Sequence, residues 1–128
     1  MSSNLAIAPP NPEPQIVGRP CAPDQFGEIV VEFSEVQPEL TGGLAAFQAR
    51  LVYPAEDRRA GTEGTVVVAF VVGLDGRACD ASIRRSLKPG LDRAAVTALE
   101  ESTFSAARQN GRPYAARMFL PARFSLQE

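Results

Sequence analysis

Residues 53–77, reading YPAEDRRAGTEGTVVVAFVVGLDGR, carry the signals that most constrain the fold of this chain. Tyr53 and Pro54 predict a helix start, because proline suits the first helical turn while the residue before it is kept out of the helical region. The β-branched run at 65–72 predicts a strand. Asp75-Gly76 is a strong signal for a hairpin turn. The segment therefore predicts a helix near 54–60, a strand near 64–73 and a return strand near 78–86.

The segments on either side add helices to this unit. Leu44, Phe47 and Leu51 recur at helical spacing and predict a short amphipathic helix that runs to about residue 51. Residues 91–104 predict the strongest helix of the chain, with its apolar stripe on one side. The members of that stripe are Leu91, Ala95, Ala98 and Leu99.

Alternation predicts how the return strand and the segment after the long helix are arranged. In the return strand, Cys79, Ala81 and Ile83 are expected on one face, and Asp80, Ser82 and Arg84 on the other. Residues 106–113, around Asn110-Gly111, are expected to form a loop.

The last segment, residues 114–126, alternates cleanly between two faces over its whole length. Pro121 cannot donate a ladder hydrogen bond, so the strand is expected at a sheet edge, or with a bulge at that point. Arg117, Phe119 and Arg123 face outward on it. Two interpretations stay open: the edge accepts an extended partner segment by β-strand addition, or Pro121 and the arginines blunt it against aggregation.

The N-terminal part differs in composition from the rest. Residues 1–27 are rich in proline and predict a flexible linker, interpreted either as a disordered tail or as the remnant of a longer spacer. The folded domain is then expected at 28–128. Residues 28–36 alternate as a strand, which must pair with an open edge of the main sheet or with another copy of the chain.

Composition excludes most catalytic chemistry. The chain has 128 residues, which fits one domain, and no histidine, which removes the commonest general base and metal ligand. The serines therefore lack an activating base. The carboxylate pairs Glu56-Asp57 and Glu100-Glu101 are interpreted as solvated helix faces. No phosphate-binding loop is present. We expect no enzyme activity, no metal and no cofactor.

Charge and cysteine content narrow the classes of function that remain possible. The net charge of −2 argues against nucleic-acid binding. An acidic leader precedes a mildly basic folded part, which favours an acidic partner segment. Cys21 and Cys79 form no CxxC pattern; one disulfide and two free thiols both remain open. No apolar run is long enough for a membrane helix, and the N-terminus does not resemble a signal peptide.

Four motifs occur in a specific order. They are QPELTGGLAAFQARLVYP at 37–54, RRAGTEGTVVVAFVVGLDGR at 58–77, RSL followed by GLDRAAVTALEESTF within 85–104, and ARQNGRPYAARMFLPARFSL at 107–126. In this order the chain resembles the C-terminal domain of the TonB energy-transducer family over about residues 36–126. The resemblance implies an α+β fold, with two helices packed on one face of a three-stranded antiparallel sheet and an extra N-terminal strand.

The same resemblance implies a function and partners. Family members are periplasmic domains that hang from an inner-membrane helix through a proline-rich spacer and work with the ExbB–ExbD proton-driven motor. Their last strand receives the TonB box of an outer-membrane TonB-dependent transporter as an added strand, which couples the proton-motive force to uptake of substrates such as siderophores. No anchor is seen in this chain, so it is expected to be either an excised fragment or a free-standing relative.

The resemblance also implies a partner-binding site in two parts. The last strand contributes Arg117, Phe119, Pro121 and Arg123. The segment around the Tyr-Pro pair is similar to a family region that also touches the partner, and here it comprises Arg50, Tyr53, Pro54, Arg58 and Arg59. Some members carry a basic residue where this chain has Glu56, so an acidic partner would have to be met by Arg50, Arg58 or Arg59.

A second hypothesis comes from a different class of protein. The chain could be a self-associating module with a TonB-like fold and no role in transport. In that case residues 28–36 would occupy the edge beside the last strand, either within the chain or in a strand-exchanged homodimer.

Overall fold

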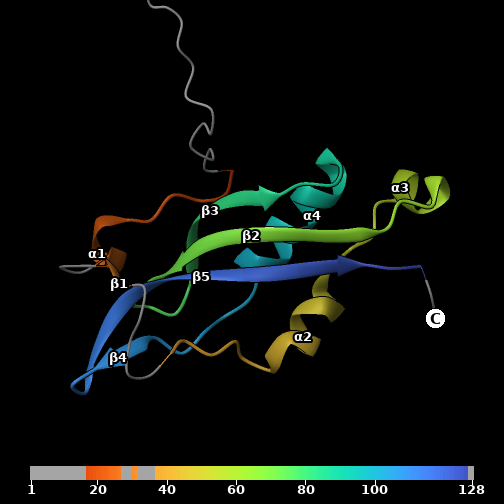
Figure 1. Ribbon diagram of the computed structural model, residues 1–128. Coiled ribbons are helices and arrows are strands. Elements are labelled where there is room, and N and C mark those ends of the chain that lie inside the picture. Colours follow the sequence, from red (N-terminus) through yellow and green to blue (C-terminus); the bar gives the residue numbers. More distant parts are fainter. Residues whose placement is uncertain (1–16, 27–29, 32–36, 127–128) are drawn as a thin grey trace, which may run out of the picture.

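The structure is a computed structural model that describes residues 17–26, 30–31 and 37–126. The elements in chain order are α1 Pro23–Phe26, β1 Val30–Val31, α2 Gly43–Arg50, α3 Ala55–Ala60, β2 Gly64–Val72, β3 Ala78–Arg85, α4 Pro89–Glu100, β4 Ala107–Gln109 and β5 Arg112–Phe124. The sheet has the strand order β1-β5-β2-β3, and β4 pairs with β5 outside this path (Figure 1).

The three long strands form the expected antiparallel sheet. β2 lies between β3 and β5, and it pairs with β5 without interruption from Gly64↔Phe124 to Val72↔Ala116. β1 adds a short parallel strand on the outer side of β5 at Ala115 and Ala116. The α+β prediction and its extra N-terminal strand are therefore confirmed; the remainder of the strand expected at 28–36 lies outside the described residues.

The main core lies between the sheet and the helices α2 and α4. Phe47 of α2 and Leu91 and Leu99 of α4 are completely buried against it. Helix α3 buries no residue and sits at one end of the sheet, as Figure 1 shows. The long helix ends at Glu100, earlier than predicted, because Thr103 and Phe104 leave it to form bridges with Arg77 and Leu40.

The expected face assignment of the return strand was wrong. Ala81 belongs to the main core, whereas Cys79 packs with Val71 and Ala115 in a second cluster. The pairing changes from Ala69↔Ser82 to Val71↔Cys79, so Asp80 and Ala81 lie opposite one residue of β2. Asp80 adopts φ 52°, and this β-bulge reverses the alternation. A bulge of this kind leaves no periodic signal in the sequence.

The loop predicted at 106–113 was also wrong, because β4 and the start of β5 form a hairpin. Ala107 pairs with Tyr114 and Gln109 with Arg112. Asn110 and Gly111 have φ values of 54° and 76°, which match the left-handed conformations of a two-residue hairpin turn. The Asn-Gly pair was therefore a hairpin signal, but β4, the strand before it, is too short to be recognised.

Residues 17–26, which we call the N-terminal strap, were assigned to the linker, yet they contact the domain. The Val17 N–H donates to the Ala81 carbonyl (2.8 Å), and the Asp80 N–H donates to the Arg19 carbonyl (2.8 Å). Cys21 and Cys79 form a disulfide. Folded structure thus begins before residue 27, while the linker prediction for residues 1–16 lies outside the described part of the chain. In that described part, no helix has the length and apolar character needed to cross a membrane.

Candidate interaction edge

The outer edge of β5 changes character along the strand. Its first part is flanked by β1, at Ala115 and Ala116. From Arg117 to Phe124, β5 pairs with β2 on one side, and among the described strands none pairs with it on the other. We call residues 117–123 the open edge. The prediction that this strand lies at an edge holds for that part only.

One side chain shows which backbone groups face the open edge. The Gln48 amide of α2 accepts from the Arg123 N–H (3.1 Å) and donates to the Arg123 carbonyl (3.0 Å). Both backbone groups of Arg123 therefore point away from β2. Successive residues of an antiparallel strand point their backbone groups alternately toward and away from the neighbouring strand. The backbone groups of Phe119 and Pro121 therefore also point away from β2.

This alternation explains why proline is tolerated at position 121. Pro121 lies opposite Val67, where a donor would point away from the β2 ladder. Its missing N–H therefore costs the sheet no hydrogen bond. The edge still presents the N–H and C=O of Phe119 and the C=O of Pro121, which are the groups that an added strand would pair with.

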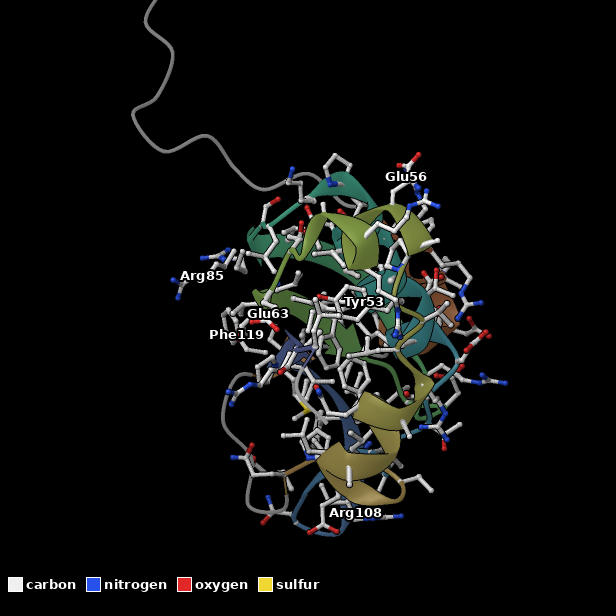
Figure 2. All side chains as sticks on the ribbon, turned by 90° about the vertical axis from the view of Figure 1, so that its right-hand side faces the viewer. Tyr53, Glu56, Glu63, Arg85, Arg108 and Phe119 are labelled. Atoms are coloured by element: carbon white, nitrogen blue, oxygen red, sulfur yellow. A yellow bond between two sulfur atoms is a disulfide. The ribbon has the colours of Figure 1, made fainter. Side chains whose placement is uncertain are left out.

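Alternate side chains of the open edge, those of Arg117, Phe119, Pro121 and Arg123, project on the sheet face opposite α2 and α4, whereas the side chains between them face the main core. Phe119 is 59% exposed and is one of the few large apolar side chains of the described residues that face solvent. The Arg84 guanidinium of β3 lies 5.7 Å from the centre of its ring, a cation–π contact made across β2. In Figure 2, Phe119 and Arg85 project from the side of the sheet away from the helices.

The Tyr-Pro segment lies at the end of the open edge. The Tyr53 ring packs edge-on against Phe124 at 5.4 Å and 80°, and its hydroxyl donates to the Thr62 carbonyl. The Arg58 guanidinium sits 5.4 Å from the centre of the Tyr53 ring. Tyr53, Arg58 and Phe124, with Gln48 and Arg123, line an open pocket of about 340 Å³.

Not every predicted partner-binding residue points toward this surface. The Arg50 guanidinium turns toward the interior and donates to the hydroxyl of Ser102 (3.4 Å), which is fully buried. Pro54 caps α3 and lies beside Gly90. Arg59 is exposed on α3. The structure thus brings Tyr53 and Arg58 to the end of the open edge and gives Arg50 a contact with the core.

Three residues of this region had no distinguishing signal in the sequence. Gln48 binds the edge at Arg123, Arg84 covers Phe119, and the Glu63 carboxylate accepts from the Leu126 N–H (2.7 Å). Each acts on a residue more than 30 positions away, so no local pattern reveals the contact. In the part of the chain that the structure describes, no group of three or more cysteine or acidic side chains could hold a metal ion.

Gln48→Ala should release the end of the open edge. It removes two hydrogen bonds to Arg123, and we expect the free energy of unfolding to fall by about 1 kcal/mol. Amide hydrogen exchange at Arg123 should accelerate, because its N–H loses its acceptor. Gln109→Ala, on β4, is the matched control and should leave that exchange rate unchanged. Unaltered exchange at Arg123 in Gln48→Ala would show that the cap is not formed in solution.

Tyr53 should make the domain sensitive to alkaline pH. Desolvation raises the pKa of Tyr53 above its usual 10.0, Glu63 and Asp57 raise it further, and Arg58 opposes them. The unfolded state then releases this proton first, so stability is complete below pH 10 and declines as pH rises toward the folded pKa. The Tyr114→Phe variant retains Tyr53 as its only tyrosine. We expect its phenolate absorbance to appear at a higher pH than that of free tyrosine. If the Tyr53 phenol titrates at the pKa of free tyrosine, this would contradict its desolvation in the folded domain.

Comparison with known proteins bears on these features. Residues 49–126 match the model of the Gram-negative bacterial TonB protein C-terminal. The chain belongs to the TonB C-terminal domain family. The match contains β2, β3, α4 and the whole of β5, and with them the open edge.

Individual TonB proteins agree with this assignment. The chain is 35% identical over 75 residues to Protein TonB of Xanthomonas campestris pv. campestris, from strain B100 and from strain ATCC 33913. This match takes in 58% of the chain and 34% of each relative, so the chain matches about a third of their length. The solution structure of the Helicobacter pylori TonB-CTD (residues 194–285) superposes with a TM-score of 0.52 at 23% identity, over 66% of this chain and 90% of that one. This likeness supports the fold.

Proposed function

We propose that this domain is a periplasmic energy-transducing adaptor that binds the TonB box of an outer-membrane TonB-dependent transporter by β-strand addition. The single observation that carries the proposal is the open edge itself. The backbone groups of Phe119 and Pro121 point away from β2, and among the described strands none pairs with them on that side of the sheet. An extended peptide would complete these hydrogen bonds and continue the sheet.

The surroundings of the edge suit such a peptide. Phe119 offers an exposed apolar contact, and the pocket beside Tyr53 and Arg58 lies where an added strand would leave the sheet. Gln48 already occupies the position of a strand partner at Arg123. Gln48 therefore ends the part of the open edge that a peptide can pair with, unless the peptide displaces it.

Coupling to a motor and the periplasmic location form part of the same proposal. A disulfide between Cys21 and Cys79 fits an oxidising compartment such as the periplasm. In this scheme the N-terminal side of the chain connects to an inner-membrane anchor that works with ExbB–ExbD. Force then reaches the domain through the N-terminal strap and leaves through the peptide on β5.

The test is a titration of the labelled domain with a TonB-box peptide, followed through backbone amide signals in NMR spectra. We expect the largest shifts at residues 117–123, and the Phe119 amide should exchange more slowly when the peptide is bound. Shifts confined to other surfaces would place the binding site elsewhere and refute strand addition at β5.

A pair of variants separates backbone pairing from side-chain contact. Phe119→Pro removes the ring and the outward N–H, whereas Phe119→Ala removes the ring alone. One hydrogen bond is worth about 0.5–1.5 kcal/mol, so Phe119→Pro should bind the peptide about two- to tenfold more weakly than Phe119→Ala. Because the Phe119 N–H lies outside the β2 ladder, both variants should fold. Equal affinities in folded variants would contradict strand addition.

The second candidate function, self-association, rests on β1. Its pairing with Ala115 and Ala116 within the same chain shows that the beginning of the β5 edge accepts an N-terminal strand. Deletion of residues 1–36 should change the oligomeric state measured by light scattering if this strand links two copies. An unchanged mass would count against an exchanged dimer.

A further inference from the structure

The N-terminal strap is attached to β3 in two ways, by weak contacts ahead of Cys21 and by a covalent bond at Cys21. The Val17 N–H donates to the β3 backbone, and the Arg19 carbonyl accepts from it, each at 2.8 Å. Cys21 is then joined to Cys79 by the disulfide. A pulling force on the chain before Val17 would break the hydrogen bonds one at a time and would be stopped at Cys21.

The disulfide closes a loop that contains much of the fold. Residues 22–78 lie inside this loop and include α1, β1, α2, α3 and β2. Because a covalent bond far outlasts hydrogen bonds under load, tension that reaches Cys21 passes directly to Cys79. The loop itself carries no tension from the N-terminal side. β1, which flanks β5 at Ala115 and Ala116, is therefore shielded from that tension.

The point at which tension enters the sheet decides how the sheet resists it. Cys79 lies opposite Val71, near the start of β3, whereas β5 ends at Phe124, opposite Gly64. Val71 and Gly64 are seven residues apart on β2, which is about 23 Å along the strands, against about 10 Å across two strand spacings. Tension between Cys79 and the end of β5 therefore runs mainly along the strands and shears them past one another.

Shear and peeling differ in the load that a sheet can bear. In shear the hydrogen bonds of a ladder are strained together, whereas a strand peeled from its end loses them one after another. β2 pairs with β5 at nine successive residues, and β1 pairs with β5 at only two. Without the disulfide, tension would follow the chain beyond Cys21 and would detach α1 and β1 first. The open edge would then lengthen to include Ala115 and Ala116.

We propose that the Cys21–Cys79 disulfide is a mechanical clasp, which directs tension from the N-terminal side into β3 in shear and keeps β1 in place on β5 under load. Its physiological role rests on the proposed function, in which the domain transmits force. It goes beyond that function because it assigns the point at which tension enters the fold. The mechanical behaviour follows from the strand geometry, so it can be measured without a partner.

Single-molecule pulling on the full chain, with handles at residues 1 and 128, tests the clasp. The unmodified protein is compared with Cys21→Ser combined with Cys79→Ser. The fully unfolded chain should be shorter by about 200 Å when the disulfide is present, because 58 residues of about 3.5 Å each stay outside the loaded path. This length verifies that the bond is closed in each molecule pulled.

The serine variant should extend in a different order from the unmodified protein. We expect an early step at low force of up to about 60 Å, the full length of residues 21–39, as α1 and β1 detach. Glu39 is the next anchor, because its N–H and its carbonyl are both hydrogen-bonded to Ser105. The disulfide-bonded protein should lack this step, and its sheet should unfold at a higher force. An early step in both proteins or in neither, or equal unfolding forces, would overturn the clasp.

Gly18→Val is the matched control for the weak contacts of the strap. A Cβ at Gly18 would lie 2.6 Å from the Glu100 carboxylate and 3.2 Å from the Ala81 side chain, so valine should displace the strap ahead of Cys21. Because this variant keeps the disulfide, its sheet should unfold at the same force as that of the unmodified protein, without the early step. A fall to the force of the serine variant would show that the hydrogen-bonded strap carries the load, and would refute the clasp.

Reduction of the folded protein gives a second route to the same comparison if the serine variant does not fold. A dithiol reductant converts both cysteines to thiols in a molecule already held at low tension, and the early step should then appear. The clasp and the proposed function can fail separately. If a TonB-box peptide shifts residues 117–123 but the mechanical difference is missing, strand addition stands and the clasp is wrong. In the converse case the mechanical inference stands and the proposed function fails.

Discussion

Replacing Cys21 and Cys79 together by serine is expected to lower the free energy of unfolding by about 4 kcal/mol. The disulfide joins residues 58 positions apart, and in the chain-entropy model closing a loop of that length costs the unfolded state this much freedom. For a domain whose total stability is about 5–15 kcal/mol, such a loss is large. Chemical denaturation of the variant and of the unmodified protein measures it.

The same replacement should loosen the N-terminal strap. The Asp80 N–H donates to the Arg19 carbonyl, and the Cys21 N–H donates to the Asp80 carboxylate (2.8 Å), so these bonds flank the disulfide. Hydrogen exchange at Asp80 should accelerate in the serine variant. The unmodified protein under reducing conditions is the control and should behave in the same way. A loss of less than about 1 kcal/mol would mean that the unfolded chain is not constrained by this bond.

Gly76→Ala should destabilise the domain by about 3 kcal/mol. Gly76 has φ 79°, a left-handed conformation that costs other residues about 1–2 kcal/mol. An added Cβ would also lie 2.2 Å from the Phe104 carbonyl oxygen, which is closer than atoms can approach. Phe104 cannot easily withdraw, because its N–H donates to the Gly76 carbonyl (2.8 Å). The clash adds a packing cost of about 1–3 kcal/mol.

Gly111→Ala is the matched control for this prediction. Gly111 has nearly the same conformation, φ 76°, but an added Cβ there would meet nothing within 4 Å. It should therefore lose only the conformational part, about 1 kcal/mol. Denaturation curves of the two variants separate backbone strain from the steric clash. Equal losses would show that the contact between the turn and Phe104 gives way freely.

Local patterns predicted the elements of this fold well because each one depends on neighbouring residues. The β-branched run became β2, and Asp75-Gly76 became the turn into β3. The apolar stripe of the long helix is buried as expected, from Leu91 to Leu99. The prediction failed at Asp80, where a bulge exchanges the faces, and at Ala107–Gln109, where the strand is too short to show alternation.

The candidate site was predicted only in part. Alternation and Pro121 were enough to suggest an outward-facing strand at an edge. That Gln48 closes this edge at Arg123 depends on α2 crossing the end of β5, 75 positions away in the chain. The direction of Arg50 likewise depends on Ser102, a buried hydroxyl supplied by the turn after α4.

The sequence by itself determined the order of helices and strands, the turn at Asp75-Gly76 and the place of proline in the last strand, because these follow from backbone preferences and side-chain periodicity. The tertiary structure decided which stretch of β5 is open, that Cys21 reaches Cys79, and that Arg84 of β3 lies over the Phe119 ring of β5. Those features depend on which residues distant in the chain pair with one another, and on the bulge at Asp80 in β3. Such long-range geometry leaves no periodic trace in one sequence.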